Sequence, residues 1–264
     1  MSSEARRHQV QLRIYGPEYA PPLVYLPGVH GDWTLIASFR KAIGEQVRFV
    51  EAAYPDTLTW SVEDYAIAVE IALQENGISH AWLLGESFSS QVVWSLAARR
   101  QFQIDGIIFA GGFVQHPARW AARVIGSCGG CIPFSVLRSM LMGYAKLAPW
   151  RFRKDPETAA NIARYIAALT EERRQGVIHR LNLVAINDPC AVARRVDVPV
   201  FALSGFWDPI APWFLIRGWL MRNCPALRDY KILWRADHNV LGTAPNAAAA
   251  LVLRWMNQQR QVEL

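Results

Sequence analysis

Ser87 has the sequence surroundings of a nucleophile. It stands in Gly-Glu-Ser-Phe-Ser, directly after an apolar run at residues 81–84 and directly before a stretch with a helical pattern. A serine on a tight turn between a buried strand and a helix exposes its hydroxyl for attack on a carbonyl carbon. The turn needs small residues two positions away on each side, and here they are Gly85 and Ser89. Serine replaces the second glycine of the usual pattern, and we predict a reactive serine rather than an ordinary turn serine.

A nucleophilic serine needs a neighbouring base, and the base needs a carboxylate that orients it and stabilises its charge. Asp208 follows an apolar run at residues 200–203, and His238 follows a predicted strand around Lys-Ile-Leu-Trp at residues 231–234. Both therefore lie in loops where predicted strands end, as Ser87 does. The carboxyl ends of parallel strands meet at one edge of a sheet, where such sheets bind ligands. We predict that the three side chains meet at this edge.

The acid and the base also have simpler interpretations. Asp208 could cap a helix that follows Pro209, which is a common role for aspartate, and His238 could be a structural histidine. Asp188, in Asn-Asp-Pro, is a second candidate acid, but it precedes the return of the chain to the sheet and suits a turn. The combination of a serine on a turn with an acid and a histidine at later strand ends favours the catalytic interpretation.

The elements that would position these loops alternate along the chain. Short apolar runs predict strands, and periodic or capped stretches predict helices; Ser61 with Asp64 resembles a capping box, and Asp32 can cap the first helix. This order predicts an α/β fold with a mostly parallel central sheet that helices cover on both faces. The expected strands are 10–15, 23–26, 47–50, 81–84, 106–110, 198–203 and 230–233, and the expected helices are 32–43, 61–76, 90–100 and 245–259.

A long helical stretch interrupts the alternation. Residues 113–186 have helical periodicity and no convincing strand, which predicts a helical cap inserted into a core made of residues 1–112 and 187–264. The net charge of the chain is +6, and residues 116–187 hold eleven basic and four acidic side chains, including the run Arg-Phe-Arg-Lys at 151–154. This basic excess could attract an anionic substrate or an anionic membrane surface; a solvated arginine-rich surface is the simpler interpretation.

Composition argues against several other classes of protein. Apolar residues make up 52% of the 264 residues, which suffices for a large core. We find no nucleic-acid-binding motif, no apolar run of the roughly 20 residues that span a bilayer, and no signal peptide, so we expect a cytoplasmic protein. Cys128 and Cys131 form Cys-x-x-Cys, but neither Cys190 nor Cys224 completes a zinc pattern. We expect no metal and no cofactor, since phosphate-loop and dinucleotide motifs are also missing.

Together these motifs resemble the α/β-hydrolase superfamily over about residues 23–255. The resemblance rests on Leu-Pro-Gly-Val-His-Gly at 26–31, Gly-Glu-Ser-Phe-Ser at 85–89, Gly-Phe-Trp-Asp at 205–208 and Asp-His at 237–238, in the triad order Ser, Asp, His. It implies the α/β-hydrolase fold with a helical cap. It also implies that Ser87 is the nucleophile, His238 the general base and then acid, and Asp208 the orienting carboxylate.

The resemblance further implies an oxyanion hole built from two backbone N–H groups. One belongs to Phe88, which follows the nucleophile at the start of a helix, where N–H groups are unpaired. The family places the other after an early buried strand, in the residue that follows a His-Gly pair. This chain has Pro-Gly-Val at residues 27–29, so Val29 is the candidate; His30 and Gly31 offer a second register.

The activity that the resemblance implies is hydrolysis of a carboxylic ester or a related acyl bond in a small molecule. A thioesterase, a carbon–carbon bond hydrolase or an acyltransferase would use the same triad, because the pocket and the cap decide specificity. A non-catalytic binding protein on the same fold is the third alternative. Trp33, Phe113 and Trp213 lie near predicted strand ends and are candidate pocket walls or, equally, core aromatic residues.

Overall fold

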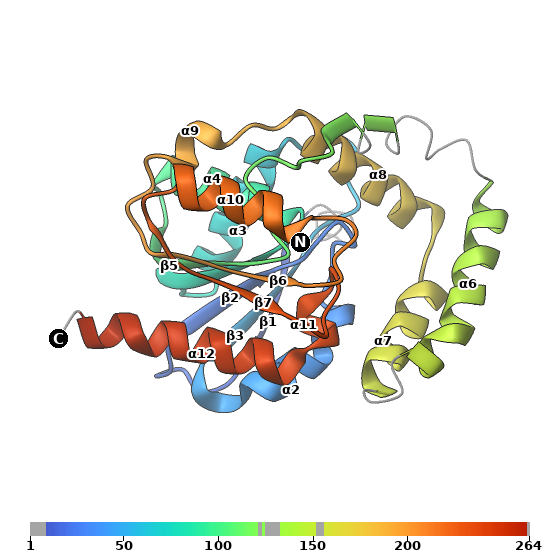
Figure 1. The fold of residues 1–264 in the computed structure, drawn as a ribbon, viewed down its shortest axis with the longest axis horizontal. Helices are drawn as coiled ribbons and strands as arrows, with labels where there is room; N and C mark the ends of the chain where they lie inside the picture. Colours follow the sequence, from blue (N-terminus) through green and yellow to red (C-terminus); the bar gives the residue numbers. More distant parts are fainter. Residues whose placement is uncertain (1–8, 121–122, 125–132, 152–155, 263–264) are drawn as a thin grey trace.

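A sheet of mostly parallel strands forms the middle layer of the structure (Figure 1). The computed structural model describes residues 9–120, 123–124, 133–151 and 156–262. Its strand order is β1-β3-β2-β4-β5-β6-β7, and within the described residues the pairing of β1 with β3 is the antiparallel one. The mostly parallel sheet predicted from the sequence is confirmed. The strands are β1 (Gln11–Tyr15), β2 (Pro22–Leu26), β3 (Arg48–Ala53), β4 (His80–Glu86), β5 (Gln103–Ala110), β6 (Val200–Gly205) and β7 (Leu227–Leu233).

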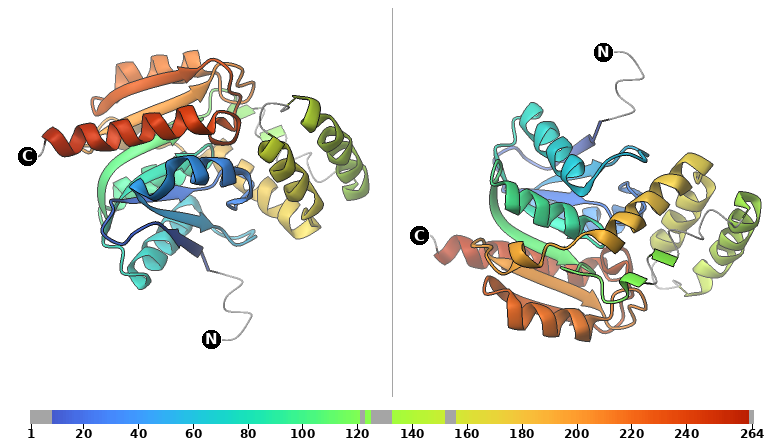
Figure 2. Two further views of the ribbon diagram at one scale, coloured as in Figure 1. Left: turned by 90° about the horizontal axis from the view of Figure 1, so that it is seen from below. Right: turned by 90° about the horizontal axis from the view of Figure 1, so that it is seen from above.

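Helices cover both faces of this sheet, and each face has its own apolar core. Successive side chains of a strand point to opposite faces, so Leu83 packs into one core and Leu84 into the other. The fully buried rings of Trp94 and Trp255 occupy the first and the second core. The first core lies under α3 (Val62–Glu75), α4 (Ser89–Arg99), α9 (Cys190–Ala193) and α10 (Trp213–Asn223), and the second lies under α2 (Ala37–Ile43), α11 (Val240–Thr243) and α12 (Pro245–Val262) (Figure 2).

Two helix starts show how far local sequence signals reach. The hydroxyl of Ser61 accepts the N–H of Asp64 at 3.2 Å, and the Asp64 carboxylate accepts the N–H of Ser61 at 2.8 Å, so α3 begins with the expected capping box. Asp32 does accept the N–H of Thr34 at 2.9 Å, but a short 3-10 turn follows and α2 begins only at Ala37. The sequence patterns do not predict a third helix, α10. Its aromatic residues and glycine have low helix propensity, and packing stabilises the helix instead.

In the described part of the stretch from 113 to 186, three long helices lie beside the edge of the sheet where the parallel strands end (Figures 1 and 2). They are α6 (Phe134–Arg151), α7 (Pro156–Ala167) and α8 (Glu171–Ile186). One buried side chain, Gln91 of α4, contacts both ends of the stretch: its Nε2 donates to the carbonyl of Val114 at 2.9 Å, and its Oε1 accepts from Nδ2 of Asn187 at 2.9 Å. The predicted boundaries of the cap therefore lie side by side at Gln91.

Some predicted features fall on residues that the structure does not describe. The pair Cys128 and Cys131 and residues 152–154 of the basic run lie outside the described ranges. Within those ranges, we find no helix that combines the length and the apolar character needed to cross a bilayer.

Candidate active site

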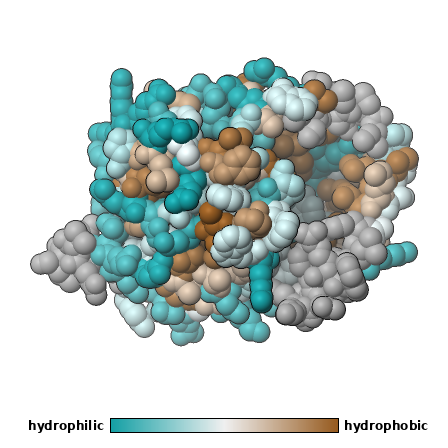
Figure 3. Space-filling model, in the orientation of Figure 1, coloured by the Kyte–Doolittle hydropathy of each residue, from teal (hydrophilic) through white to brown (hydrophobic). Residues whose placement is uncertain are grey.

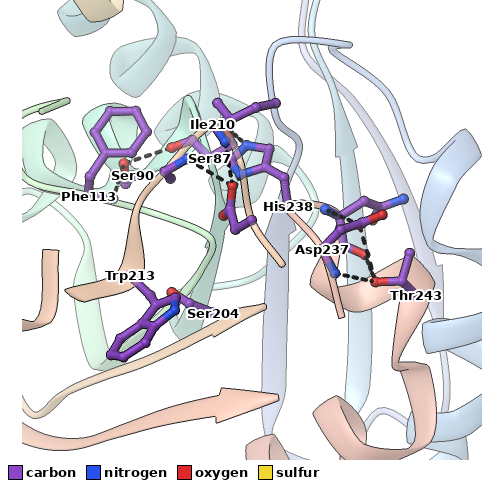
Figure 4. A network of polar contacts seen from close by, with 12 residues as sticks. Ser87, Ser90, Phe113, Ser204, Ile210, Trp213, Asp237, His238 and Thr243 are labelled. Atoms are coloured by element: carbon purple, nitrogen blue, oxygen red, sulfur yellow. Dashed lines mark hydrogen bonds and ion pairs between the residues drawn. The ribbon is translucent and has the colours of Figure 1, made fainter. Parts of the chain in front are cut away.

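Three side chains meet at the edge of the sheet where β4, β6 and β7 end. Figure 4 labels two of them, Ser87 and His238. Ser87 follows β4, Asp208 follows β6 and His238 follows β7. Nε2 of His238 lies 2.8 Å from Oγ of Ser87, and Nδ1 of the same ring lies 2.8 Å from Oδ2 of Asp208. With its proton on Nδ1 and donated to the carboxylate, the ring has Nε2 free to accept the serine proton. The arrangement can therefore turn the Ser87 hydroxyl into a nucleophile.

Ser87 has a backbone conformation that few residues other than glycine adopt. Its φ angle is 48°, in the left-handed region, and its N–H donates to the carbonyl of Ala110 at 3.1 Å. Gly85 permits the close approach of α4 to the strand, since a Cβ there would lie 2.9 Å from Cγ2 of Val93. The strained turn thus holds the serine between β4 and α4, as the sequence motif predicts.

Ser89, which stands where the usual pattern has glycine, has a structural role. Its buried hydroxyl donates to the carbonyl of Pro27 and lies 2.6 Å from the hydroxyl of Tyr54. The bond to Pro27 ties the turn of Ser87 to the loop after β2. The loop and the serine are in close contact, because a Cβ on Gly28 would lie only 3.5 Å from Cβ of Ser87. The replacement of glycine by serine therefore adds a connection between the two segments that would form an oxyanion hole.

The two candidate oxyanion donors lie on these segments. Phe88 directly precedes α4, Val29 follows Gly28, and neither N–H donates a hydrogen bond to any other residue that the structure describes. In the second register, the N–H of Gly31 is already engaged. The N–H of Gly31 donates to the carbonyl of Gly28 at 3.0 Å, and Nε2 of His30 lies 3.4 Å from the hydroxyl of Tyr25. Available N–H groups thus favour Val29 over Gly31.

A buried carboxylate lies directly before the nucleophile. Glu86 is 3% exposed, accepts a hydrogen bond from the hydroxyl of Tyr25, and lies 3.9 Å from Nε2 of His30. Burial, together with the negative charge of Glu86 and the hydrogen bond to it, holds the pKa of Tyr25 well above its usual value, so Tyr25 stays a donor. Sequence motifs do not reveal this network, because its members come from two separate strands and a loop.

Asp208 contacts His238 and also organises a turn, but it does not cap a helix, since α10 has Pro212 at its N-cap and no side-chain cap. Its Oδ1 accepts the N–H groups of Ile210 and Ala211, each at 2.8 Å, while its Oδ2 contacts His238. The carboxylate thus organises the turn before α10 and also binds the imidazole. Its side chain is fully buried, so both oxygens are satisfied by protein groups.

Asp208 also influences the protonation of His238. Burial lowers the pKa of His238, but the hydrogen bond and the negative charge of Asp208 raise it by more, with further contributions from Glu86 and Asp237. The net effect is a pKa above the ordinary value of histidine. Asp237 stabilises the loop that carries His238. Its Oδ1 accepts the N–H of Asn239 at 3.1 Å and the hydroxyl of Thr243 at 3.3 Å (Figure 4).

The other candidates from the sequence lie outside this triad. Asp188 is exposed and accepts the N–H of Cys190 at 3.1 Å, which is the turn role. Phe113 is buried, and its N–H donates at 3.2 Å to Oγ of Ser90, which is two residues after Phe88. The ring of Trp33 packs under the guanidinium of Arg13 at 4.0 Å. Trp213 is half-buried at the start of α10 and packs against other aromatic rings.

A second histidine, His116, lies close to the triad without any sequence signal that marks it. It is 9% exposed, and its Nδ1 accepts the N–H of Ala118 at 3.1 Å. Burial lowers the pKa of His116, which a hydrogen bond with the backbone of Ile210 partly opposes, and His238 is near enough to act on it electrostatically. In the described part of the chain, no group of three His, Cys, Asp or Glu side chains could hold a metal ion.

Two basic residues of α8 attach the insertion to the core. Arg180 is fully buried; its Nε donates to the carbonyl of Val29 at 2.8 Å, and its guanidinium lies 3.3 Å from the carboxylate of Asp56. Arg173 pairs with Asp32 at 3.0 Å. The charges of Arg173 and Arg180 are therefore engaged within the protein and are not free to attract a ligand. These two residues are also not part of a purely solvated basic surface.

Replacing Arg180 with methionine is expected to lower the free energy of unfolding by roughly 3 kcal/mol, because it leaves buried carbonyl groups such as that of Val29 without a donor. Urea denaturation measures this change. The matched control is Arg173→Met on the same helix, which removes a partly exposed ion pair and should change stability by less than about 1 kcal/mol. Equal effects of the two replacements would contradict the special role of Arg180.

Comparison with solved structures identifies the fold of the chain. No protein-family model matches the chain, and no curated protein matches its sequence significantly. A thermophilic esterase from Thermogutta terrifontis superposes with a TM-score of 0.76 over 95% of this chain and 93% of its own, at 15% identity. A hydrolase from Pseudomonas aeruginosa gives 0.78 over 94% of each chain, at 14% identity. An enol-lactonase from Burkholderia xenovorans gives 0.74 over 94% and 96%, at 16% identity.

Similarity of this extent over nearly whole chains defines the fold. The chain has the α/β-hydrolase fold, as the motifs at residues 85–89, 205–208 and 237–238 led us to predict. At identities of 13–16% the comparison defines the fold alone, so the chemistry must be argued from the site.

Proposed function

We propose that this protein is a serine hydrolase that cleaves a carboxylic ester or a related acyl bond. The observation that supports the proposal most is the continuous chain of hydrogen bonds from Asp208 through His238 to Ser87, with 2.8 Å at each step. These hydrogen bonds supply a nucleophilic serine with both a base and an acid that orients the base. A serine whose only role is to form a turn needs neither. Several solved structures with the same fold carry the words esterase or lactonase in their names.

In this proposal the reaction has two halves. Oγ of Ser87 attacks the acyl carbonyl carbon while Nε2 of His238 takes its proton, and the N–H groups of Phe88 and Val29 stabilise the oxyanion. The imidazolium then protonates the leaving alcohol, and an acyl-enzyme remains. Water, deprotonated by His238, attacks the ester carbonyl and releases the acid with Ser87 restored. Asp208 keeps the imidazole in the tautomer that both halves need.

The triad alone does not select the acyl group or the acceptor. A thioesterase, a carbon–carbon bond hydrolase and an acyltransferase would use Ser87 in the same way. Product analysis by mass spectrometry, with and without an added alcohol or thiol acceptor, separates hydrolysis from transfer.

The direct test of the nucleophile is labelling with a fluorophosphonate probe. The wild-type protein should form a covalent adduct on Ser87, which peptide mass mapping locates, and the Ser87→Ala variant should not be labelled. Ser95→Ala, on the same helix α4 but farther from the turn, is the matched control and should label like the wild type. A wild-type protein whose serines all stay unlabelled would instead support a binding protein on this fold.

The raised pKa of His238 predicts the pH at which the activity is lost on the acid side of the pH profile, its acid limb. His238 must be neutral to accept the proton of Ser87, so kcat/KM should fall as the pH decreases through the pKa of His238, which lies above the ordinary value of about 6.5. In Asp208→Asn the carboxylate no longer raises this pKa while burial still lowers it, so the residual activity should have its acid limb at lower pH. A pH profile of kcat/KM for both proteins measures the shift; an unchanged limb would contradict the assignment.

A further inference from the structure

Five aromatic rings form a continuous cluster beside the loops of Asp208 and His238. Phe206 lies at its centre, with its ring centroid 4.4 Å from that of Trp234, 5.2 Å from that of Trp207 and 6.0 Å from that of Trp213. The ring of Phe214 lies 5.7 Å from that of Trp213. Trp207, Trp234 and Phe214 are 69%, 68% and 60% exposed. Large aromatic side chains that gather in the open mark a surface that binds something apolar.

Helix α10 extends the cluster. Its inner side chains, such as Leu220, pack into the core, whereas several apolar side chains on and before it are exposed. Where Figure 1 draws α10 and its adjoining loops, Figure 3 shows hydrophobic residues among hydrophilic ones. We call this region the aromatic surface. It consists of Phe206, Trp207, Ile210, Trp213, Phe214, Leu215, Met221 and Trp234.

Within residues 205–235, which carry the aromatic surface, the exposed charged side chains are basic. Between residues 205 and 235 both acidic side chains are engaged: Asp208 is buried in the triad, and Asp229 pairs with Lys231 at 3.1 Å. The same segment exposes basic side chains, two of them on the outer side of α10 between its apolar residues. The exposed basic residues without an ion-pair partner among the described residues are Arg217, Arg222, Arg228 and Arg235. The charge around the aromatic surface therefore suits an anionic partner.

We propose that the aromatic surface binds the face of an anionic lipid bilayer. Tryptophan and phenylalanine favour the boundary between headgroups and acyl chains, and nearby arginines gain from anionic headgroups. Pairing with a second copy of the chain is disfavoured by charge, because a two-fold contact on this face would place Arg217 and Arg222 of both copies in one interface without acidic partners from residues 205–235. The partner is thus identified by its chemistry as apolar within and anionic at its surface.

The aromatic surface lies beside the loops of the proposed triad, so it also bears on the substrate class, an inference that rests on the proposed function. Trp207 immediately precedes Asp208, and its N–H donates to the carbonyl of Ala236 in the loop of His238. Binding a bilayer through Trp207 and Trp234 would therefore hold the loops of the acid and the base against the membrane. The substrate class that fits is an acyl ester embedded in, or released from, a lipid layer.

Co-sedimentation of the full chain with lipid vesicles tests the proposal. The protein should pellet with vesicles of phosphatidylcholine that contain phosphatidylglycerol, and much less with phosphatidylcholine alone. Binding should weaken at about 1 M salt, where the Debye length is about 3 Å. The triple variant Trp207→Ser, Phe214→Ser, Trp234→Ser should bind at least about tenfold more weakly, and so should Arg217→Gln with Arg222→Gln.

The controls separate this proposal from the others. Tyr19→Ser removes an aromatic side chain that is 91% exposed and lies outside the aromatic surface, and it should bind like the wild type. Thermal unfolding shows that each variant is folded, and the charge variant changes no apolar residue. Repeating the assay in Ser87→Ala protein makes binding independent of catalysis, so an unreactive serine would end only the proposed function. Absence of wild-type binding to the anionic vesicles, equal binding of the triple variant, or self-association that the triple variant abolishes would each overturn the membrane proposal.

Discussion

Replacing Ser87 with alanine should lower kcat/KM for a hydrolysable ester by a factor on the order of 10⁴ or more. The alanine has no oxygen to form the acyl-enzyme, so the reaction loses its covalent route. His238 and the N–H groups of Phe88 and Val29 stay in place and could support only slow attack by water. Steady-state kinetics on a panel of p-nitrophenyl esters and thioesters, chosen after a substrate screen, measures the change.

Two comparisons make the result specific to the hydroxyl of Ser87. Ser95→Ala, farther along α4, should keep the wild-type kcat/KM, which excludes a general effect of altering that helix. The free energy of unfolding of Ser87→Ala should stay close to the wild-type value, because the hydroxyl bonds only to His238 among the described residues. Undiminished turnover by the folded Ser87→Ala protein would end the proposal of a serine nucleophile.

Replacing Asp208 with asparagine should lower kcat/KM by about 10⁴-fold. The amide is nearly the same size as the carboxylate, and its oxygen can still accept the N–H groups of Ile210 and Ala211 that Oδ1 accepts at 2.8 Å. Its NH₂ group, however, would point at Nδ1 of His238, and an NH₂ group can only donate a hydrogen bond. The imidazole would then carry its proton on Nε2, where it cannot accept the proton of Ser87.

This replacement distinguishes the two roles of Asp208. If Asp208 only organised the turn before α10, Asp208→Asn would keep both stability and activity. In the catalytic interpretation it keeps most of the stability and loses activity. Asp208→Ala loses both, since the N–H groups of Ile210 and Ala211 lose their acceptor, and the buried one at Ala211 alone costs about 1–3 kcal/mol. The matched control is Asp188→Asn, the other candidate acid, which is exposed in a turn and should leave kcat/KM unchanged. A strong loss there instead would reassign the acid.

The sheet and the order of the triad could be predicted because their signals are local. A run such as residues 81–84 is apolar at every position, which indicates a strand buried on both faces, and a turn with Gly85 and Ser87 follows directly. Loops at the carboxyl ends of parallel strands must lie at one edge of the sheet. The 2.8 Å contacts among Ser87, His238 and Asp208 are consistent with this reasoning.

Contacts between distant side chains could not be predicted in this way. In the sequence, Arg173 and Arg180 are simply part of a basic excess. Nothing in it indicates that Arg180 would be buried against the carbonyl of Val29. Ser89 reads as a mild departure from glycine, whereas the fold gives it a bond to Pro27. His116 has no motif around it at all. Each of these residues acquires its role from a segment that is remote in the sequence.

By itself, the sequence determined the alternation of strands and helices, the strained turn of Ser87 and the identity of a candidate acid and base, since periodicity and turn chemistry depend on neighbouring residues. Only the tertiary structure decided which charges pair, how the insertion is attached, and that Trp207, Phe214 and Trp234 gather on one exposed surface. The physical reason is that packing energies and hydrogen bonds act between atoms within a few ångströms, and chain folding alone sets which remote residues come that close.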